Sequence, residues 1–238
     1  NSYITGYVGG VVDFGVTHNF YGDTEETGVD AFVLKLNSEG VPQWANRYGY
    51  SQFEIGNGIA VDSSGNSYIA GEHYGDTNFG GITATHNGGT DYFVLKLNSD
   101  GVSQWVYSVS SSATDIAYDI AIDSSGNSYT TGKFAGTINF GSESVTANVQ
   151  DDIFVLKLDS SGTFQWVYTA GGIAGTSISN DVGYGIAVDS SGNVYTAGVF
   201  VENIELTTGV NIEGEVNPGA LKHDALVFKL NSSGQYSD

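Results

Sequence analysis

The hydrophobic residues of this chain fall in short runs that are apolar on both sides of an extended strand. In Phe93-Val-Leu-Lys-Leu97, three apolar side chains point to one face, and Val94 shares the other face with Lys96. Ile59-Ala-Val61 is likewise apolar on both faces. A sheet with one face in water would alternate apolar and polar residues. The pattern therefore predicts strands in sheets that are covered on both sides.

These runs belong to a long internal repeat. Asp30-Ala-Phe-Val-Leu-Lys-Leu-Asn37 returns three times, at offsets of 61, 61 and 72 residues. A second unit, Gly58-Ile-Ala-Val-Asp-Ser-Ser-Gly-Asn-Ser-Tyr-Ile-Ala-Gly71, returns at 119–132 and 185–198. A Gln-Trp pair follows the first unit in the first three copies. Three motifs in a fixed order at a fixed spacing indicate a repeat architecture.

Each repeat is predicted to hold four antiparallel strands joined by hairpins. The Asp-Ser-Ser-Gly-Asn segment fits a turn in which Gly takes a positive φ and Asp bonds nearby backbone. Because blades packed face to face around an axis cover both faces of every sheet, we expect an all-β fold of four-stranded β-propeller blades. The expected blades are 1–57, which lacks its first strand, then 58–118, 119–184 and 185–238.

The composition supports this fold class and excludes several partners. The many Tyr and Phe residues favour strands, and the 34 Gly residues suit frequent tight turns. The formal net charge of −20 would repel nucleic acid and anionic membranes, so neither is an expected partner. No apolar run is long enough for membrane insertion, and the absence of Cys excludes disulfides and thiolate sites.

Taken together, the motifs resemble the SBBP-type β-propeller repeat of bacterial and archaeal secreted and cell-surface proteins. The likeness lies in Gly-Ile-Ala-Val-Asp-Ser-Ser-Gly-Asn, then Asn/Asp-Phe-Gly, then Asp-x-Phe-Val-Leu-Lys-Leu and Gln-Trp. It implies an extracellular or cell-surface location and no catalytic residues. The fourth repeat departs most, because Ile204-Glu-Leu206 replaces the Asn-Phe-Gly and its loop is longer.

Three arrangements of the ends stay open. The first strand of the repeat occurs only three times, and the chain has no Met. We expect the sequence to be part of a longer array of repeats of the same chain. Alternatively, a neighbouring subunit of a homo-oligomer supplies the strand, or the four repeats close into a ring.

The repeated charged residues are expected to be structural. Lys35, Lys96, Lys157 and Lys229 should lie over neighbouring blades and pair with repeated carboxylates, rather than form a ring of anion ligands. The candidate carboxylates are Asp62, Asp123 and Asp189, or Asp30, Asp91, Asp152 and Asp224.

No cofactor or metal site is predicted. The Asp-Ser-Ser-Gly-Asn turns lack the ligand spacing of a calcium loop. Weak calcium binding stays open where acids cluster, although a solvated acidic face is the preferred interpretation. These clusters are Asp151-Asp152, Asp115 with Asp119, and Glu202, Glu205, Glu213 and Glu215.

Aromatic and basic side chains offer few candidates for chemistry. The His residues, His18, His73, His86 and His223, occupy non-equivalent positions and are expected at the surface. No Gly-x-Ser-x-Gly motif is present. Trp44, Trp105 and Trp166 are the candidate ligand-binding residues, as a platform for sugars, although one Trp per repeat is more typical of a core.

The function predicted from the sequence is therefore a structural or adhesive scaffold without catalysis. Such a scaffold could assemble with other subunits that complete its sheets with a strand. The alternative is a glycan- or ligand-binding propeller that uses the Val201–His223 insertion. A propeller hydrolase or lyase is the third interpretation, because fold alone does not exclude an enzyme.

Overall fold

The chain forms strands and no helix in the part that the structure describes. The computed structural model describes residues 1–10, 12–16, 19–21, 28–49, 52–173, 180–214 and 223–237, with only the backbone described at 19–21 and 149. Nearly all strand pairs are antiparallel, which confirms the all-β antiparallel prediction. Within the described residues, no helix is long and apolar enough to cross a membrane.

The first two repeats each build one main sheet. Repeat 1 has the strand order β1-β3-β4-β2, with β1 at Ser2–Val8, β3 at Asp30–Leu36, β4 at Pro42–Tyr48 and β2 at Asn19–Tyr21. Repeat 2 has the order β5-β6-β9-β10, with β5 at Phe53–Val61, β6 at Ser67–Tyr74, β9 at Asp91–Leu97 and β10 at Ser103–Val109. A short hairpin of β7 (Thr77–Asn78) and β8 (Thr83–Ala84) follows β6.

The last two repeats are joined by a shared sheet edge. Repeat 3 contains β11 (Ile116–Ile122), β12 (Ser128–Phe140), β13 (Glu143–Leu158) and β14 (Phe164–Gly172). Repeat 4 contains β15 (Val182–Val188), β16 (Val194–Val201) and β19 (His223–Leu230), with a hairpin of β17 (Asn203–Thr207) and β18 (Val210–Glu213). That hairpin pairs with β14, so repeat 3 belongs to a six-stranded sheet and repeat 4 keeps three strands.

The prediction of four-stranded sheets throughout was therefore too regular, and the described residues form no closed propeller. In repeat 1 the fourth place is taken by β2, which runs parallel to β4. The predicted Asn-Phe-Gly loop is instead a hairpin or an extension of the two central strands. Its apolar side chains fill the core, which draws the backbone into strand pairing: Phe79, Ile138, Phe140, Ile204 and Leu206 are each at most 2% exposed.

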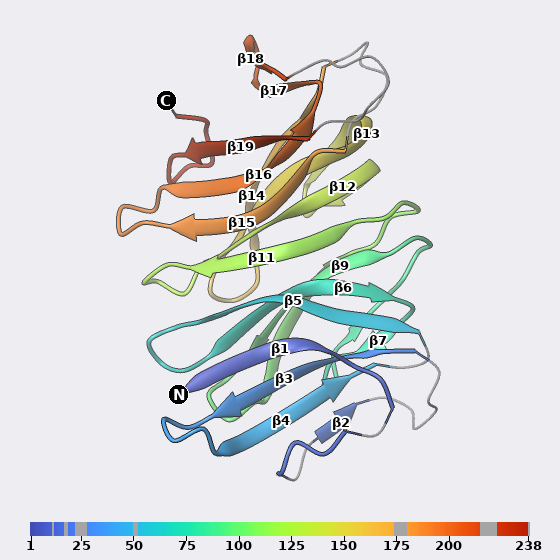
Figure 1. Cartoon of the computed structure of the whole chain (residues 1–238), viewed down its shortest axis with the longest axis vertical. Coiled ribbons are helices and arrows are strands. Elements are labelled where there is room, and N and C mark those ends of the chain that lie inside the picture. The colour runs from blue at the N-terminus through green and yellow to red at the C-terminus, as the bar shows by residue number, and fades with distance from the viewer. Residues whose placement is uncertain are drawn as a thin grey trace.

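Consecutive repeats pack sheet against sheet in a stack (Figure 1). Each of the three apolar clusters combines residues of two neighbouring repeats. In β9, for example, Phe93 and Leu95 join a cluster with repeat 1, whereas Tyr92 and Val94 join a cluster with repeat 3. All four are fully buried, so the expected cover on both faces is confirmed.

The first strands of repeats 2, 3 and 4, which are β5, β11 and β15, lie side by side along the stack (Figure 1). They begin at Phe53, Ile116 and Val182, ahead of the expected boundaries. The strands β5 and β11 approach closely at Gly58, where a Cβ would stand 2.8 Å from the Cα of Asp119.

Side-chain hydrogen bonds also cross between the first strands. Asn57 Nδ2 donates to the Ala117 carbonyl at 3.0 Å, and the Ile186 amide donates to Asp119 Oδ2 at 2.9 Å.

Candidate functional site

The Asp-Ser-Ser-Gly-Asn segments form the hairpin turns expected from the sequence. Asp62 Oδ1 accepts hydrogen bonds from the amides of Ser64 and Asn66, at 2.9 and 3.0 Å. Gly65 has a φ of 80°. Burial acts to raise the pKa of Asp62, but the hydrogen bonds from Asn66 and Ser64 outweigh it and hold the pKa below its ordinary value. The carboxylate is engaged by its own turn, and the turns at Asp123 and Asp189 repeat these bonds.

One row of three side chains crosses the same face of the first three sheets. The strand register places a tyrosine beside a lysine and that lysine beside a tryptophan. We call this the Tyr–Lys–Trp row; its members are Tyr3, Lys35 and Trp44, then Tyr68, Lys96 and Trp105, then Tyr129, Lys157 and Trp166. Each lysine Nζ lies over the ring of the neighbouring tyrosine, 4.9–5.4 Å from its centroid.

The row of one repeat contacts the two turns of the next repeat. In repeat 1, Lys35 Nζ and Trp44 Nε1 both donate to the Ser99 carbonyl, at 2.7 and 3.0 Å, and Tyr3 Oη donates to the Gly65 carbonyl at 3.2 Å. The same three bonds recur from repeat 2 to repeat 3, with the carbonyls of Ser160 and Gly126 as acceptors. The row therefore joins consecutive repeats in one direction along the stack.

The contact is less complete between repeats 3 and 4. Trp166 still packs on a turn glycine, because a Cβ on Gly234 would lie 2.5 Å from the indole. Its Nε1 is buried and has no hydrogen-bond partner among the described residues. Tyr129 Oη donates to Asp123 Oδ2 of its own repeat instead, at 3.0 Å.

The prediction that the repeated lysines pair with carboxylates was wrong. The salt bridges among the described residues are Arg47–Asp30, His86–Asp91 and Lys133–Asp151, and none involves a repeated lysine. Lys35 and Lys96 reach past the carboxylates to a carbonyl of the next repeat.

The candidate sugar platform lies within the same row. All three tryptophans, Trp44, Trp105 and Trp166, are half-buried. Each indole packs against a turn glycine of the next repeat; these glycines are, in the same order, Gly101, Gly162 and Gly234. These glycines have φ near 80°, and a Cβ there would stand 2.5–2.8 Å from the indole. One indole face is therefore already covered by protein. Binding of a ligand by these residues stays a prediction.

The prediction of surface histidines was wrong for His73, which is fully buried in β6. Its Nδ1 contacts the Gly75 carbonyl and its Nε2 contacts Ser108 Oγ, both at 2.9 Å, so the ring links β6 to β10. Burial lowers its pKa. His223 is exposed, His86 is half-buried, and His18 lies outside the described residues.

A repeated set of buried acids was missed from the sequence. Glu54, Asp115 and Asp181 stand at equivalent places at the start of the first strand, and each is at most 1% exposed. Asp115 Oδ1 accepts from the Ala135 amide and Asp181 Oδ1 from the Val201 amide, at 3.1 and 2.9 Å. The sequence did carry a signal for these acids. The Gly-Ile-Ala-Val-Asp unit begins at residues 58, 119 and 185, and an acidic residue stands four positions before each copy.

A second repeated acid lies near Asp115 and near Asp181. Asp91 is fully buried and accepts hydrogen bonds from the Ser111 and Asn87 amides, at 2.9 and 3.2 Å. Asp152 is 2% exposed and accepts from the Asn148 amide at 3.0 Å. The interpretation of Asp115 and Asp152 as members of a solvated acidic face was therefore wrong, because main-chain amides take the place of water around them.

Burial changes the acidity of these groups. Burial raises the pKa of Asp115 to about 6, and the nearby charge of Asp91 adds to the effect. Burial likewise raises the pKa of Asp152 to about 6, with Asp181 adding to it. Asp115 and Asp152 are therefore protonated more readily than free aspartates.

The acid clusters do not assemble into a larger ligand set in the described chain. There, no group of three or more His, Asp or Glu side chains is placed to hold a metal ion. Asp151 pairs with Lys133 at 2.9 Å. In the Val201–His223 insertion, β17 and β18 carry Glu205 and Glu213, whereas Glu215 lies outside the described residues.

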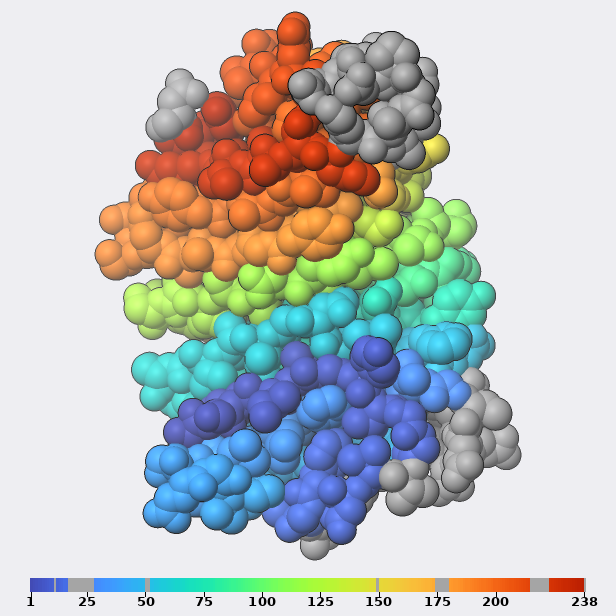
Figure 2. All heavy atoms as spheres, in the orientation of Figure 1, coloured from blue at the N-terminus to red at the C-terminus, as the bar shows by residue number. Residues whose placement is uncertain are grey.

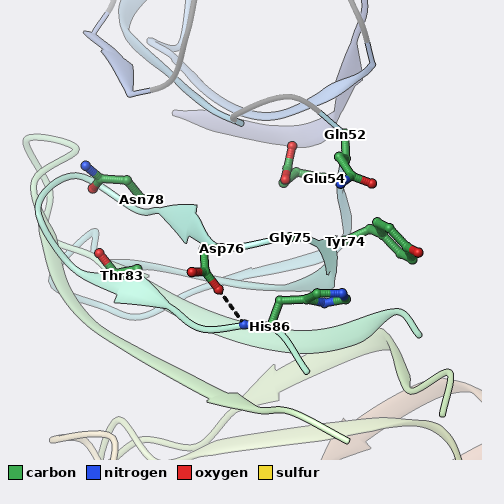
Figure 3. A pocket seen from close by; sticks show the side chains of 8 residues that line it. All are labelled: Gln52, Glu54, Tyr74, Gly75, Asp76, Asn78, Thr83 and His86. Atoms are coloured by element: carbon green, nitrogen blue, oxygen red, sulfur yellow. Dashed lines mark hydrogen bonds between the residues drawn. The ribbon is translucent and has the colours of Figure 1, made fainter. Parts of the chain in front are cut away.

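A pocket of about 610 Å³ opens at the edge of repeat 2 opposite the turns (Figure 3). Tyr74 and His86 line it with rings whose centroids are 4.9 Å apart, and Asp76 Oδ1 accepts a hydrogen bond from the His86 amide at 2.8 Å. Gln52 and Glu54 lie across from them (Figure 3). Aromatic rings beside amide and carboxylate groups suit a polyhydroxylated molecule with one apolar face.

The family comparison supports the resemblance seen in the motifs. The family model described as SBBP, beta-propeller repeat, matches residues 43–80, 107–133 and 173–199. Each match starts at the end of one repeat and continues through the first strand of the next. The match therefore spans the boundary between two consecutive repeats, which we call a junction. No curated protein matches the chain.

Replacement of Asp152 by Asn is expected to reduce the pH dependence of stability between about pH 4 and 6. A carboxyl whose pKa is raised in the folded protein stabilises it fully below the unfolded pKa, and this contribution is lost as pH rises through about 6. Urea unfolding followed by tryptophan fluorescence at a series of pH values measures the slope.

Asp159→Asn is the matched control. Hydrogen bonds from Ser161 lower the pKa of Asp159, so its contribution is lost only at lower pH, below the unfolded value. A D152N slope equal to that of the unchanged chain would contradict the raised pKa.

Proposed function

We propose, from its SBBP beta-propeller repeats, that the chain is a non-catalytic scaffold of propeller blades in an extracellular or cell-surface protein. The repeats would hold their loops in fixed positions along a stack, as other repeat proteins do. Adhesion or support of neighbouring modules is the role that such a stack performs.

Support for this role comes from the side chains that recur in the repeats. The Tyr–Lys–Trp row donates to turn carbonyls of the next repeat. The repeated aspartates accept from turn amides, and the buried acids at the strand starts accept from main-chain amides or, at Glu54, from Thr77 Oγ1 at 3.0 Å. The row therefore packs one repeat on the next, and the repeated acids hold the turns and strands of their own repeat in place. Selection for a scaffold predicts this distribution of residues.

A comparison of two tryptophans tests the scaffold role. Trp105→Phe removes the bond from Nε1 to the Ser160 carbonyl, whereas Trp166→Phe removes an Nε1 that has no partner among the described residues. We expect W105F to lower the free energy of unfolding by about 1 kcal/mol more than W166F. Urea unfolding at neutral pH measures the difference.

Equal stability of W105F, W166F and the unchanged chain would overturn the structural assignment of the row. If both variants also lost retention on a neutral polysaccharide, the row would be a sugar platform instead.

The location is tested on the producing cells. An antibody raised against the chain is expected to label intact cells as strongly as permeabilised cells, by fluorescence and by immunogold microscopy. Labelling that requires permeabilisation would contradict an extracellular or cell-surface location.

The pocket beside Tyr74 supports a second candidate function, the binding of a neutral glycan. Charged glycans of the acidic type are disfavoured by the net charge of −20. In pull-down on neutral polysaccharides, Tyr74→Ala is expected to weaken retention about tenfold or more, because stacking area is lost.

Tyr184→Ala is the control, since Tyr184 is also exposed, at 53% against 39% for Tyr74, and lies in repeat 4. Unchanged retention of Y74A would exclude this pocket as the glycan site.

A further inference from the structure

The loop between β8 and β9 carries the sequence His86-Asn87-Gly88 beside the pocket near Tyr74. This loop belongs to repeat 2, which lies between repeat 1 and repeat 3 in the stack (Figure 2). His86 lines the pocket, and the side chain of Asn87 is exposed. An asparagine followed by glycine loses its side-chain amide most readily, because a residue without Cβ lets its own nitrogen approach the carboxamide carbon.

The imidazole of His86 lies on the nitrogen that would react. The Gly88 amide donates a hydrogen bond to His86 Nε2 at 3.2 Å. On the other side of the ring, Nδ1 lies 3.1 Å from Asp91 Oδ2. A carboxylate oxygen only accepts, so these partners assign the ring proton to Nδ1 and leave Nε2 as an acceptor. His86 therefore has the arrangement of a catalytic base that a carboxylate orients.

Hydrogen bonds to neighbouring aspartates hold this arrangement in place. The His86 amide donates to Asp76 Oδ1 at 2.8 Å (Figure 3), and the Asn87 amide donates to Asp91 Oδ2 at 3.2 Å. Asp91 is fully buried and also accepts from the Ser111 amide at 2.9 Å. The imidazole is thus positioned before any reaction begins.

The equivalent loop of repeat 3 has the same asparagine without the reactive neighbours. The Asn148 amide donates to a buried aspartate at 3.0 Å, as the Asn87 amide does. Ala147 precedes Asn148 and Val149 follows it, so repeat 3 lacks both the histidine and the glycine. Because the bond that shapes the loop occurs in both repeats, the histidine and the glycine are not required for it.

The chain has one other Asn-Gly pair, Asn57-Gly58, and this pair lies within β5. Asn57 Nδ2 donates to the Ala117 carbonyl at 3.0 Å, and Gly58 packs closely against the backbone of Asp119. The strand holds the pair extended, with its carboxamide bonded elsewhere. Asn57 is therefore an internal reference for Asn87.

We propose that Asn87 is a site of self-catalysed deamidation, with His86 as the catalytic base. Nε2 takes the proton of the Gly88 N–H as that nitrogen bonds to Asn87 Cγ. The bond from Cγ to Nδ2 then breaks, and Nε2 returns the proton to the departing nitrogen, which leaves as ammonia. The succinimide ring that results takes up one water molecule and opens to aspartate or isoaspartate.

The reaction changes the charge beside the pocket. It replaces a neutral amide with a carboxylate next to His86, which lines the pocket. Solvent water reaches the ring because the side chain of Asn87 is exposed. The pocket rim would thus become more acidic as the protein ages, without a second enzyme.

Mass spectrometry of the full chain, incubated at neutral pH and then digested with trypsin, tests the proposal. Asn57 and Asn87 lie on one tryptic peptide, residues 48–96, so fragmentation compares the two sites in the same molecules. We expect Asn87 to convert about tenfold faster than Asn57, or more, in the folded chain. Unfolding in urea removes the His86 contact and should slow the reaction at Asn87 until the two rates are similar.

His86→Gln distinguishes a base from a side chain that only shapes the loop. Glutamine retains hydrogen-bonding atoms but takes up no proton at neutral pH, so the rate at Asn87 should fall about tenfold or more. A purely structural histidine would have the opposite effect, because a looser loop reaches the cyclic geometry more easily. His223→Gln, in repeat 4, is the matched control and should leave the rate unchanged. Circular dichroism verifies that both variants fold.

Two outcomes would overturn the proposal: an H86Q chain that deamidates at Asn87 as fast as the unchanged chain, or a folded chain in which Asn87 reacts no faster than in urea. The second comparison needs no variant, so it decides the matter even where H86Q does not fold.

Discussion

The structure depends on the burial of apolar sheet faces against the sheets of neighbouring repeats. A sheet such as β5-β6-β9-β10 has apolar residues on both sides and cannot keep either side in water without a large hydrophobic penalty. Packing sheet on sheet removes that penalty, and the Tyr–Lys–Trp row adds hydrogen bonds at the rim of each junction. The repeat is therefore not the unit of stability; the junction is.

Direction follows from the asymmetry of the junction. The row donates and the turns of the next repeat accept, so each repeat has two different faces. The hydrogen bonds from Lys35 to Ser99 and from Lys96 to Ser160 both run from one repeat to the next along the chain. This asymmetry gives the stack a single direction, which fits the proposed scaffold role.

The sequence predicted the packing well but the partners of individual polar groups less well. Apolar residues on both faces of Phe93–Leu97 require cover on both sides, and the turn at Asp62 follows from local hydrogen bonding. The partner of Lys96 was missed because it is a main-chain carbonyl of the next repeat. The position of that carbonyl depends on the offset with which one sheet packs on the other. His73 and Asp115 were missed for a similar reason, since the strands that bury them are distant in the sequence.

The sequence by itself determined where the repeated central strands and their Asp-Ser-Ser-Gly-Asn turns lie, and that the fold is all-β, because side-chain direction alternates along a strand and turn residues act locally. The tertiary structure alone decided three other features: the pairing of β17 with β14, the burial of the acids at the strand starts, and the contrast between Val155 and Val227. Each of these depends on which surfaces meet across a junction. A similar local sequence gives a buried valine or an exposed one according to whether a neighbouring repeat covers it.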